Sequence, residues 1–276
     1  MMVQVTGASL VGRTTNMRLG TVAVARAKPP AYAPGTLVGT HSIAISGVYG
    51  MAFDGTYVWA YSDVSNYLAQ VSTAGALLNS YSSVGGTGYT LTYCAGDLWE
   101  ANYASELMYK MSTAGTRISS TALALGSSYA MTNDGTNLWV FMVSGTLLKI
   151  STVPAITTSY ALGATYDGCY AMTFDGTYLW SVSYPTGNLN KITTAGTVSA
   201  SYSLGFTTAN HAGLAYDGTN LWFINGNGNL YMISTAGVIL NTYTTLGLSS
   251  CYSLTYGGGF LWTTNFTTGT LYQIAA

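Results

Sequence analysis

The chain has 276 residues, of which 49% are hydrophobic and only 6% are charged, whereas ordinary soluble domains carry about 25% charged residues. No apolar run approaches the ~20 residues needed to span a bilayer, and the N-terminus lacks the apolar core and cleavage site of a secretory signal, so we expect neither membrane insertion nor a leader. The three cysteines, Cys94, Cys169 and Cys251, show no metal-binding spacing, and we expect buried free thiols.

The first 39 residues differ in charge from the rest of the chain. They contain four basic residues and no Asp or Glu, and hence carry a charge of +4, while the remainder holds four basic and nine acidic residues: Arg13, Arg18, Arg26 and Lys28 are the basic residues of this arm. Residues 28–35 are rich in proline, which removes backbone donors and favours an extended, stiff linker. We therefore predict an anchoring arm and linker at residues 1–39 and a separate domain at residues 40–276.

Tryptophan marks a repeat that fills this second domain. Its six copies are separated by 40, 40, 41, 42 and 40 residues: Trp59, Trp99, Trp139, Trp180, Trp222 and Trp262. A turn precedes each tryptophan, as in Asp175-Gly176-Thr177, and it degenerates to Ala95-Gly96-Asp97 in the second copy and to Gly257-Gly258-Gly259 in the sixth. Asp-Gly between alternating apolar stretches predicts a hairpin with a type I′ turn, because glycine accepts a positive φ. The repeated aspartates therefore cap turns rather than bind calcium.

A second turn follows each tryptophan, as in Ser72-Thr73-Ala74-Gly75. Four short strands lie between these turns, and in the fourth copy we place them at residues 170–174, 178–183, 189–193 and 199–204. A period of about 40 residues with four strands per unit is typical of a β-propeller blade. The sequence therefore predicts an all-β fold, a six-bladed β-propeller of four-stranded blades.

The sixth repeat stops after its third strand. A segment before the first tryptophan, residues 42–47, resembles the fourth strand of a complete blade, so we expect this N-terminal strand to complete the last blade and remove the exposed sheet edges. Along each first strand small and large residues alternate, as in Gly50 and Ala52 against Met51 and Phe53. We expect the large residues of one blade to pack on the small ones of its neighbour, with the tryptophans between blades.

The phrase from Asp175 to Trp180, continued by residues 188–192 and 194–198, resembles the NHL-repeat and streptogramin-lyase-like propellers over residues 41–276. In the lyases of that group, His and Glu side chains with a magnesium ion carry the chemistry. This chain has only His41, His211, Glu100 and Glu106, without a recurrent His/Glu set at loop positions. We therefore expect no catalytic residues, no metal and no cofactor; His41 is structural, and His211 faces the channel mouth as a hydrogen-bonded bystander or, alternatively, as a lone functional histidine.

A tyrosine opens the innermost strand in five of the six blades, with Ala212 in the remaining position: Tyr49, Tyr89, Tyr129, Tyr170 and Tyr252. Loop residues Tyr103 and Tyr184 are expected on the same face, together with His211. Aromatic rings beside Asn and Asp side chains suit stacking on sugars. The alternative is that the tyrosines only pack, with their hydroxyls bonded to neighbouring backbone. No basic residue accompanies them, so we expect no nucleic acid on this face.

These observations lead to one functional expectation and two alternatives. We expect a non-enzymatic structural or binding protein of a larger assembly, by analogy of composition a virion component such as a bacteriophage capsid decoration or tail protein. Residues 1–39 are its predicted contact with other proteins of the assembly. The alternatives are an extracellular or cell-surface lectin that uses the tyrosines and a lyase-like enzyme around His211.

Overall fold

The computed structural model describes residues 32–82, 88–163, 166, 168–208 and 211–276. These residues form six four-stranded antiparallel sheets and no α-helix, which confirms the six-bladed β-propeller predicted from the sequence. In the described part of the chain we therefore find no helix with the length and apolar character to cross a membrane.

Each blade consists of four strands that follow one another in the sequence, except in the last blade. The first blade comprises β2 (Val48–Phe53), β3 (Tyr57–Ser62), β4 (Tyr67–Ser72) and β5 (Leu77–Ser82). The second comprises β6 (Thr92–Cys94), β7 (Asp97–Ala101), β8 (Leu107–Ser112) and β9 (Arg117–Ala122). The third comprises β10 (Ser128–Asn133), β11 (Asn137–Met142), β12 (Thr146–Ser151) and β13 (Ile156–Ala161).

The remaining three blades follow the same plan. The fourth comprises β14 (Cys169–Phe174), β15 (Tyr178–Ser183), β16 (Asn188–Thr193) and β17 (Val198–Ser203), each within one residue of the predicted bounds. The fifth comprises β18 (Ala212–Tyr216), β19 (Leu221–Asn225), β20 (Leu230–Ile233) and β21 (Ile239–Tyr243). The sixth comprises β22 (Thr255–Gly257), β23 (Phe260–Thr264), β24 (Thr270–Ala275) and β1 (Leu37–Ser42).

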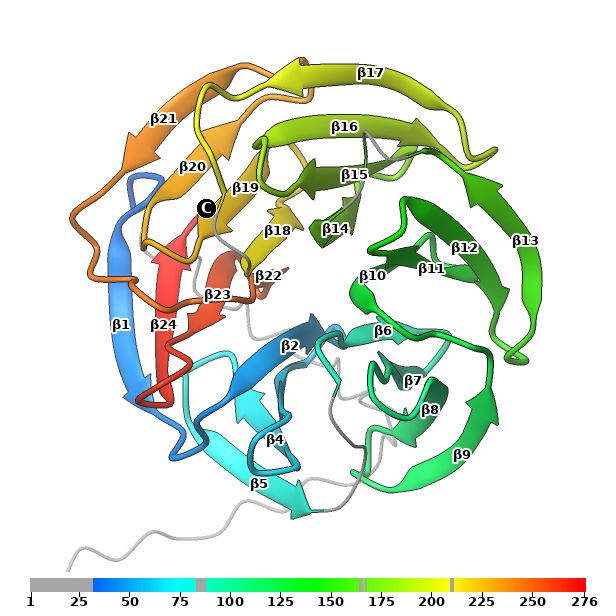
Figure 1. Cartoon of the computed structure of the whole chain (residues 1–276). Helices are drawn as coiled ribbons and strands as arrows, with labels where there is room; N and C mark the ends of the chain where they lie inside the picture. The colour runs from blue at the N-terminus through cyan, green and yellow to red at the C-terminus, as the bar shows by residue number, and fades with distance from the viewer. Residues whose placement is uncertain (1–31, 83–87, 164–165, 167, 209–210) are drawn as a thin grey trace, which may run out of the picture. The chain divides into compact units, whose positions relative to one another are not determined.

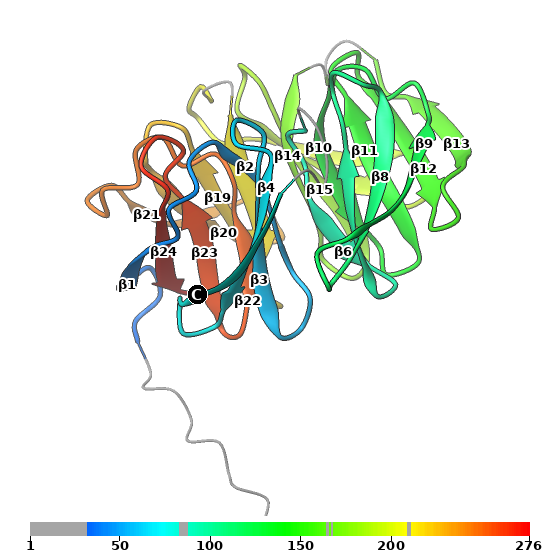
Figure 2. The ribbon, with the colours of Figure 1, turned by 90° about the horizontal axis from the view of Figure 1, so that it is seen from below.

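The blades are arranged around a central axis, with the first strand of each nearest the centre and the fourth on the rim (Figure 1). The first strand pairs only with the second, so its other edge faces the axis. Seen from the side, the sheets stand next to one another around the ring (Figure 2). Since successive strands alternate in direction, the Asp-Gly turns lie on one face, here called the turn face. The loops between second and third strands, such as Tyr184–Gly187, lie on the opposite, loop face.

The ring closes through β1, which pairs antiparallel with β24, so the N-terminal strand completes the last blade as predicted. The predicted position, residues 42–47, is wrong: the strand is Leu37–Ser42, and it spans the predicted 39/40 domain boundary. The alternation of Ile43 and Ile45 suggested a strand, but these side chains are buried in the connection to the first blade, where they pack on Trp262.

The residues just before β1 and the end of β24 meet with the hydrogen bonds of a blade turn, although no peptide bond joins them. The Gly35 N–H donates to the Ala275 carbonyl (2.8 Å), and the Ala275 N–H donates to the Thr36 carbonyl (2.9 Å). The same two bonds close the continuous turn of residues 72–76 in the first blade. Gly35 has a φ of 76° and Gly75 one of 80°. The residues just before β1 therefore reproduce half of a blade turn and hold the ring closed without a peptide bond.

The Asp-Gly turns fix both the hairpin and the tryptophan. The Asp175 carboxylate accepts hydrogen bonds from the backbone of Thr177 (2.8 Å) and Tyr178 (2.6 Å) through Oδ1, and from Nε1 of Trp180 (2.7 Å) through Oδ2. This confirms the predicted turn capping. Gly176 has a φ of 93°, whereas Thr177 has no positive φ, so the predicted type I′ turn, which needs a positive φ at both central residues, is wrong.

The tryptophans pack between blades, as predicted. Trp180 is fully buried in a cluster with Leu214 and Leu221 of the fifth blade. Near the axis, a Cβ added to Gly213 would overlap Leu254 of the next blade, which confirms the predicted packing of small on large residues. On the rim side, Tyr202 of β17 stacks on Trp180 with ring centroids 6.3 Å apart.

Candidate functional site

The innermost strands carry a repeated bulge at the predicted tyrosines. In the first blade Val48 pairs with Ser62 and Gly50 pairs with Tyr61, so that Tyr49 is skipped by the register. The same shift occurs around Tyr129 and Tyr170, and Tyr89 and Tyr252 follow isolated bridges. A bulge re-aims the side chain of the extra residue. Here it accounts for tyrosines that meet at the loop-face end of the channel.

The five tyrosines pack against one another around the mouth. Ring centroids are 4.6 Å apart for Tyr49 and Tyr89, 5.0 Å for Tyr89 and Tyr129, and 4.8 Å for Tyr129 and Tyr170. Tyr252 lies 5.8 Å from Tyr49. These spacings are those of favourable aromatic pairs, about 4.5–7 Å. The rings therefore contact each other and leave little open space between them.

His211 completes this set and occupies the sixth position. In the fifth blade the register runs without a shift from Ala212 to Gly213, so this blade lacks the bulge residue. The sequence assigned the sixth position to Ala212, whereas the structure places His211 there. Its ring lies 4.9 to 6.2 Å from those of four tyrosines: Tyr49, Tyr252, Tyr170 and Tyr89. We call these five tyrosines and His211 the mouth cluster.

A second layer of aromatic side chains comes from the loops between second and third strands. The ring of Tyr103 lies 5.6 Å from Tyr89, and that of Tyr184 lies 5.5 Å from Tyr170. All eight predicted ligand-binding residues thus lie together in these two aromatic layers. Phe266, 4.8 Å from Tyr49, joins it without having been predicted as a site residue. Its position after Asn265, like that of Tyr103 after Asn102, was the available signal.

Burial shifts the pKa values of residues in the mouth cluster towards their neutral forms. It lowers the pKa of His211 below its usual 6.5, and no carboxylate contributes to that shift. It likewise raises the pKa of Tyr49 and of Tyr170. At pH 7 the His211 imidazole and the Tyr49 and Tyr170 hydroxyls are therefore neutral. Neutral aromatic rings in mutual contact are suited to packing and stacking.

Asp63 is the acidic group beside this cluster. Burial raises its pKa to about 6, while backbone hydrogen bonds oppose the shift. Its Oδ1 is buried without a hydrogen-bond partner among the described residues. The negative charge of Asp63 contributes to the raised pKa of Tyr49 and Tyr89. Asp63 is thus an incompletely solvated carboxylate at the edge of the mouth cluster.

Below the mouth cluster a ring of six large apolar side chains divides the channel: Met51, Leu91, Met131, Met172, Leu214 and Leu254. These residues line both a hollow of about 70 Å³ beneath the mouth cluster and one of about 170 Å³ that reaches the turn face. The channel therefore has two hollows, separated by this apolar ring.

The other predicted features are placed as follows. The cysteines are free and buried, as predicted, and burial raises the pKa of Cys169 to about 12. Throughout residues 32–276, apart from the gaps given above, no three His, Cys, Asp or Glu residues are placed to hold a metal ion. His41 lies in β1, with its ring 6.4 Å from that of Trp262. The predicted assembly contacts lie outside the described residues: Arg13, Arg18, Arg26 and Lys28.

The sequence matches no family model and no curated protein. Solved structures do match the fold. A streptogramin B lyase structure superposes with a TM-score of 0.62 at 18% identity and covers 86% of each chain. Virginiamycin B lyase from Staphylococcus aureus superposes at 0.61 and 16% identity, covering 84% of this chain and 95% of that one. BamB from Moraxella catarrhalis gives 0.54 at 14% identity, over 89% of this chain and 92% of that one. At these identities the likeness shows the fold: the chain is a six-bladed propeller similar to these lyases and to BamB.

Proposed function

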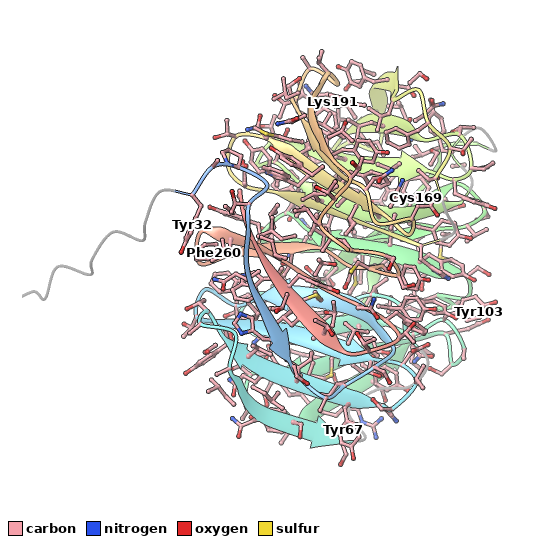
Figure 3. The ribbon with its side chains drawn as sticks, turned by 90° about the vertical axis from the view of Figure 1, so that its left-hand side faces the viewer. Tyr32, Tyr67, Tyr103, Cys169, Lys191 and Phe260 are labelled. Atoms are coloured by element: carbon pink, nitrogen blue, oxygen red, sulfur yellow. The ribbon has the colours of Figure 1, made fainter. Side chains whose placement is uncertain are left out.

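We propose that this chain is a non-enzymatic structural and binding component of a larger assembly, a virion protein of the capsid-decoration or tail kind. Residues 1–39 dock it to other proteins of the particle. The observation that carries this proposal is the position of the chain's entry into the propeller. Tyr32 packs near Phe260 (ring centroids 6.4 Å apart) on one side of the ring, and Tyr103 lies on the other (Figure 3). A propeller held through its first residues would present the loop face outward.

The surroundings of His211 support a role without catalysis. A general base needs a group that orients its ring and a position within reach of substrate. His211 is instead surrounded by tyrosine rings, and no carboxylate shifts its pKa. One solved relative by fold, at 18% identity and a TM-score of 0.58, is described as a catalytically inactive histidine-to-alanine variant of virginiamycin B lyase with quinupristin. A histidine therefore matters for activity in that lyase, and turnover lost in His211→Ala would argue for the enzymatic alternative.

The outer surface supports display on a particle. The rim strand β13 exposes Thr157, Thr158 and Ser159, and β17 exposes its three serine side chains, Ser199, Ser201 and Ser203. These stretches of the rim carry hydroxyl groups, beside exposed apolar residues such as Ile118, Ile156 and Leu240 on other parts of the rim strands. The charge difference between the arm and the rest of the chain adds a basic segment that an acidic partner surface would attract.

The experiment compares the full chain with a version that begins at Tyr32, which retains the Gly35 and Thr36 bonds to Ala275. Both are expressed with a tag in the source organism, and particles are separated by density-gradient sedimentation. The full chain is expected in the particle fraction, and the shortened chain at the position of a folded monomer. Equal incorporation of both would contradict docking through the arm, and absence of both from particles would contradict the assembly role.

A second candidate function is glycan binding at the loop face. The two aromatic layers at this face favour it, because Tyr103 and Tyr184 lie outside the mouth cluster and are half-buried. A glycan array tests this candidate with the full chain and the Tyr103→Ala and Tyr184→Ala variants. Binding that is lost in both variants supports it. Binding that is unchanged in both, or absent from the full chain, contradicts it.

A further inference from the structure

The two ends of the central channel differ in a way that points to a second site. At the loop face, the mouth cluster closes the channel with rings in mutual contact, such as Tyr49 with Tyr89 at 4.6 Å. At the turn face, the first strands also end in aromatic residues, Phe53, Tyr93, Tyr216 and Tyr256 among them. No ring contact links these four residues to one another. The turn-face hollow is therefore lined by aromatic side chains that do not contact one another.

The side chains that border the hollow at this end pack on neighbouring blades instead of on each other. The Phe53 ring packs over Gly257 of the sixth blade, where a Cβ would overlap it. Asn133, which stands where the other blades have an aromatic residue, donates from Nδ2 to the Thr92 hydroxyl (2.7 Å) and to the Tyr93 carbonyl (3.0 Å). These contacts turn the rim side chains sideways, and the hollow between them has a cavity volume of about 170 Å³.

The walls of this hollow offer both donors and acceptors and no charge. Thr132, Thr173 and Thr255 line it, and within the described residues none of their hydroxyls has a protein hydrogen-bond partner. The free edges of the first strands also face the axis and present backbone N–H and C=O groups. Among the described residues that line the hollow, none is a Lys, Arg, Asp or Glu. The floor is the apolar ring that contains Met51 and Met131.

We propose that the turn-face mouth binds a small uncharged polyhydroxyl compound of monosaccharide size. A hydroxyl group both donates and accepts, so it matches walls of threonine hydroxyls and free peptide groups. The C–H faces of such a ligand suit the apolar floor and the aromatic rim. An anion would find no positive charge here, and a cation would find no carboxylate in the walls. This site is distinct from the glycan candidate at the loop face, and it does not depend on the assembly role.

The site lies on the face where the chain enters the propeller, because Pro34, Ala276 and Tyr256 border one common groove. Docking through residues 1–39 would bring this mouth towards the partner. The free full-length chain is therefore the form in which the site is tested.

The experiment is ligand-observed NMR on the full-length chain with methyl glycosides of glucose, galactose and N-acetylglucosamine, and with choline as a cationic comparison. The variants are Thr132→Val and Thr173→Val, which keep the side-chain shape and remove the hydroxyl. Thr158→Val on the exposed rim strand β13 is the matched control, and Tyr170→Phe reports on binding at the other mouth. Unchanged melting curves establish that the variants are folded. We expect at least one glycoside to bind, with affinity about threefold to tenfold weaker in each of the two channel variants, the effect of one lost hydrogen bond, and unchanged in Thr158→Val.

Three results would overturn the proposal. The first is no binding by any glycoside, and the second is binding by choline alone, which would assign a different ligand class. The third is glycoside binding that the two channel variants leave intact and Tyr170→Phe weakens, which would place the sugar at the loop face. If a channel variant does not fold, Thr255→Val replaces it, and the same outcomes apply.

Discussion

Oδ2 of Asp175 lies 2.7 Å from Nε1 of Trp180, so one carboxylate closes a turn and also satisfies the indole that fills the space between two blades. The same bond recurs at 2.6 to 2.9 Å in the other three Asp-Gly blades. Where the aspartate is missing, the indole donates to a backbone carbonyl instead, that of Cys94 (3.1 Å) or of Gly257 (2.9 Å). The repeat therefore conserves the satisfied indole rather than the aspartate.

This relationship predicts the outcome of a double-mutant cycle. Asp175→Asn should destabilise the protein by about 1–3 kcal/mol, because the amide group cannot accept from the indole and the backbone at once and leaves a buried donor unsatisfied. In a Trp180→Phe background, which has no indole N–H, the cost of Asp175→Asn should be smaller. Urea unfolding measures all four proteins. Equal costs in both backgrounds would show that the two residues are not coupled.

Removal of the whole indole should have a larger effect. Trp180→Ala should lower the free energy of unfolding by roughly 3–5 kcal/mol, as truncation of buried tryptophan does, because it empties the space between the fourth and fifth blades. Thermal unfolding measures the change. A melting temperature equal to that of the unchanged protein would contradict the assignment of Trp180 to the core.

A glycine at five of the six blade junctions predicts a contrast between two similar substitutions. Gly196 and Gly176 have φ values of 73° and 93°, so alanine strains the backbone at either. A Cβ at Gly196 would also overlap the ring of Tyr160 in the preceding blade, whereas a Cβ at Gly176 meets nothing within 4 Å. Gly196→Ala should therefore be the more destabilising of the two, beyond the strain of about 1–2 kcal/mol that both share.

The matched control for this contrast comes from the chain itself. Where the second blade meets the third, Thr121 occupies the place of the tyrosine and Pro154 that of the glycine. Tyr160→Thr combined with Gly196→Ala should accordingly bring the added cost down towards that of Gly176→Ala. Chemical unfolding measures the stability of the three variants. If Gly196→Ala costs as much without the Tyr160 ring as with it, the overlap between the added Cβ and that ring is not the cause.

Asp63 predicts a pH dependence of stability. Burial raises its pKa from 3.8 to about 6, so the folded protein holds this proton more tightly than the unfolded chain does. The resulting stabilisation is complete below about pH 3.8 and is lost as the pH rises through about 6. Asp63→Asn removes the charge at every pH. Its melting temperature should exceed that of the unchanged protein at pH 8, and the difference should disappear near pH 4; a constant difference across this range would contradict a buried, ionised Asp63.

Much of the fold could be predicted because the same turns and strand patterns recur in several copies of the repeat. Evenly spaced tryptophans and Asp-Gly turns defined blade number and strand bounds, and Phe174 and Trp180 fell where the alternation placed them. The closing strand was predicted at the wrong residues because its sequence does not recur in the other blades. Its glycine and polar residues, Gly39 to His41, give no strand pattern, whereas the buried Ile43 and Ile45 imitate one.

The candidate site was predicted as a set of residues but not as an arrangement. The position of the tyrosines placed them at one mouth, yet the bulge that aims Tyr49 inward depends on pairing register, which the sequence does not show. His211 entered the sixth position because the fifth blade lacks one residue there. The hollow at the other end of the channel was not predicted. The alternation along the first strands assigned Phe53 and Tyr216 to packing near the axis, and only the structure shows that their rings do not contact one another.

Docking to a particle through the first 39 residues, as proposed above, can be tested with a fusion protein. Residues 1–39 are joined to an unrelated monomeric fluorescent protein and expressed in the source organism beside an equal fusion to residues 32–276. We expect fluorescence in the sedimented particles for the first fusion and at the top of the gradient for the second. Particles labelled by the propeller fusion and not by the arm fusion would contradict this docking.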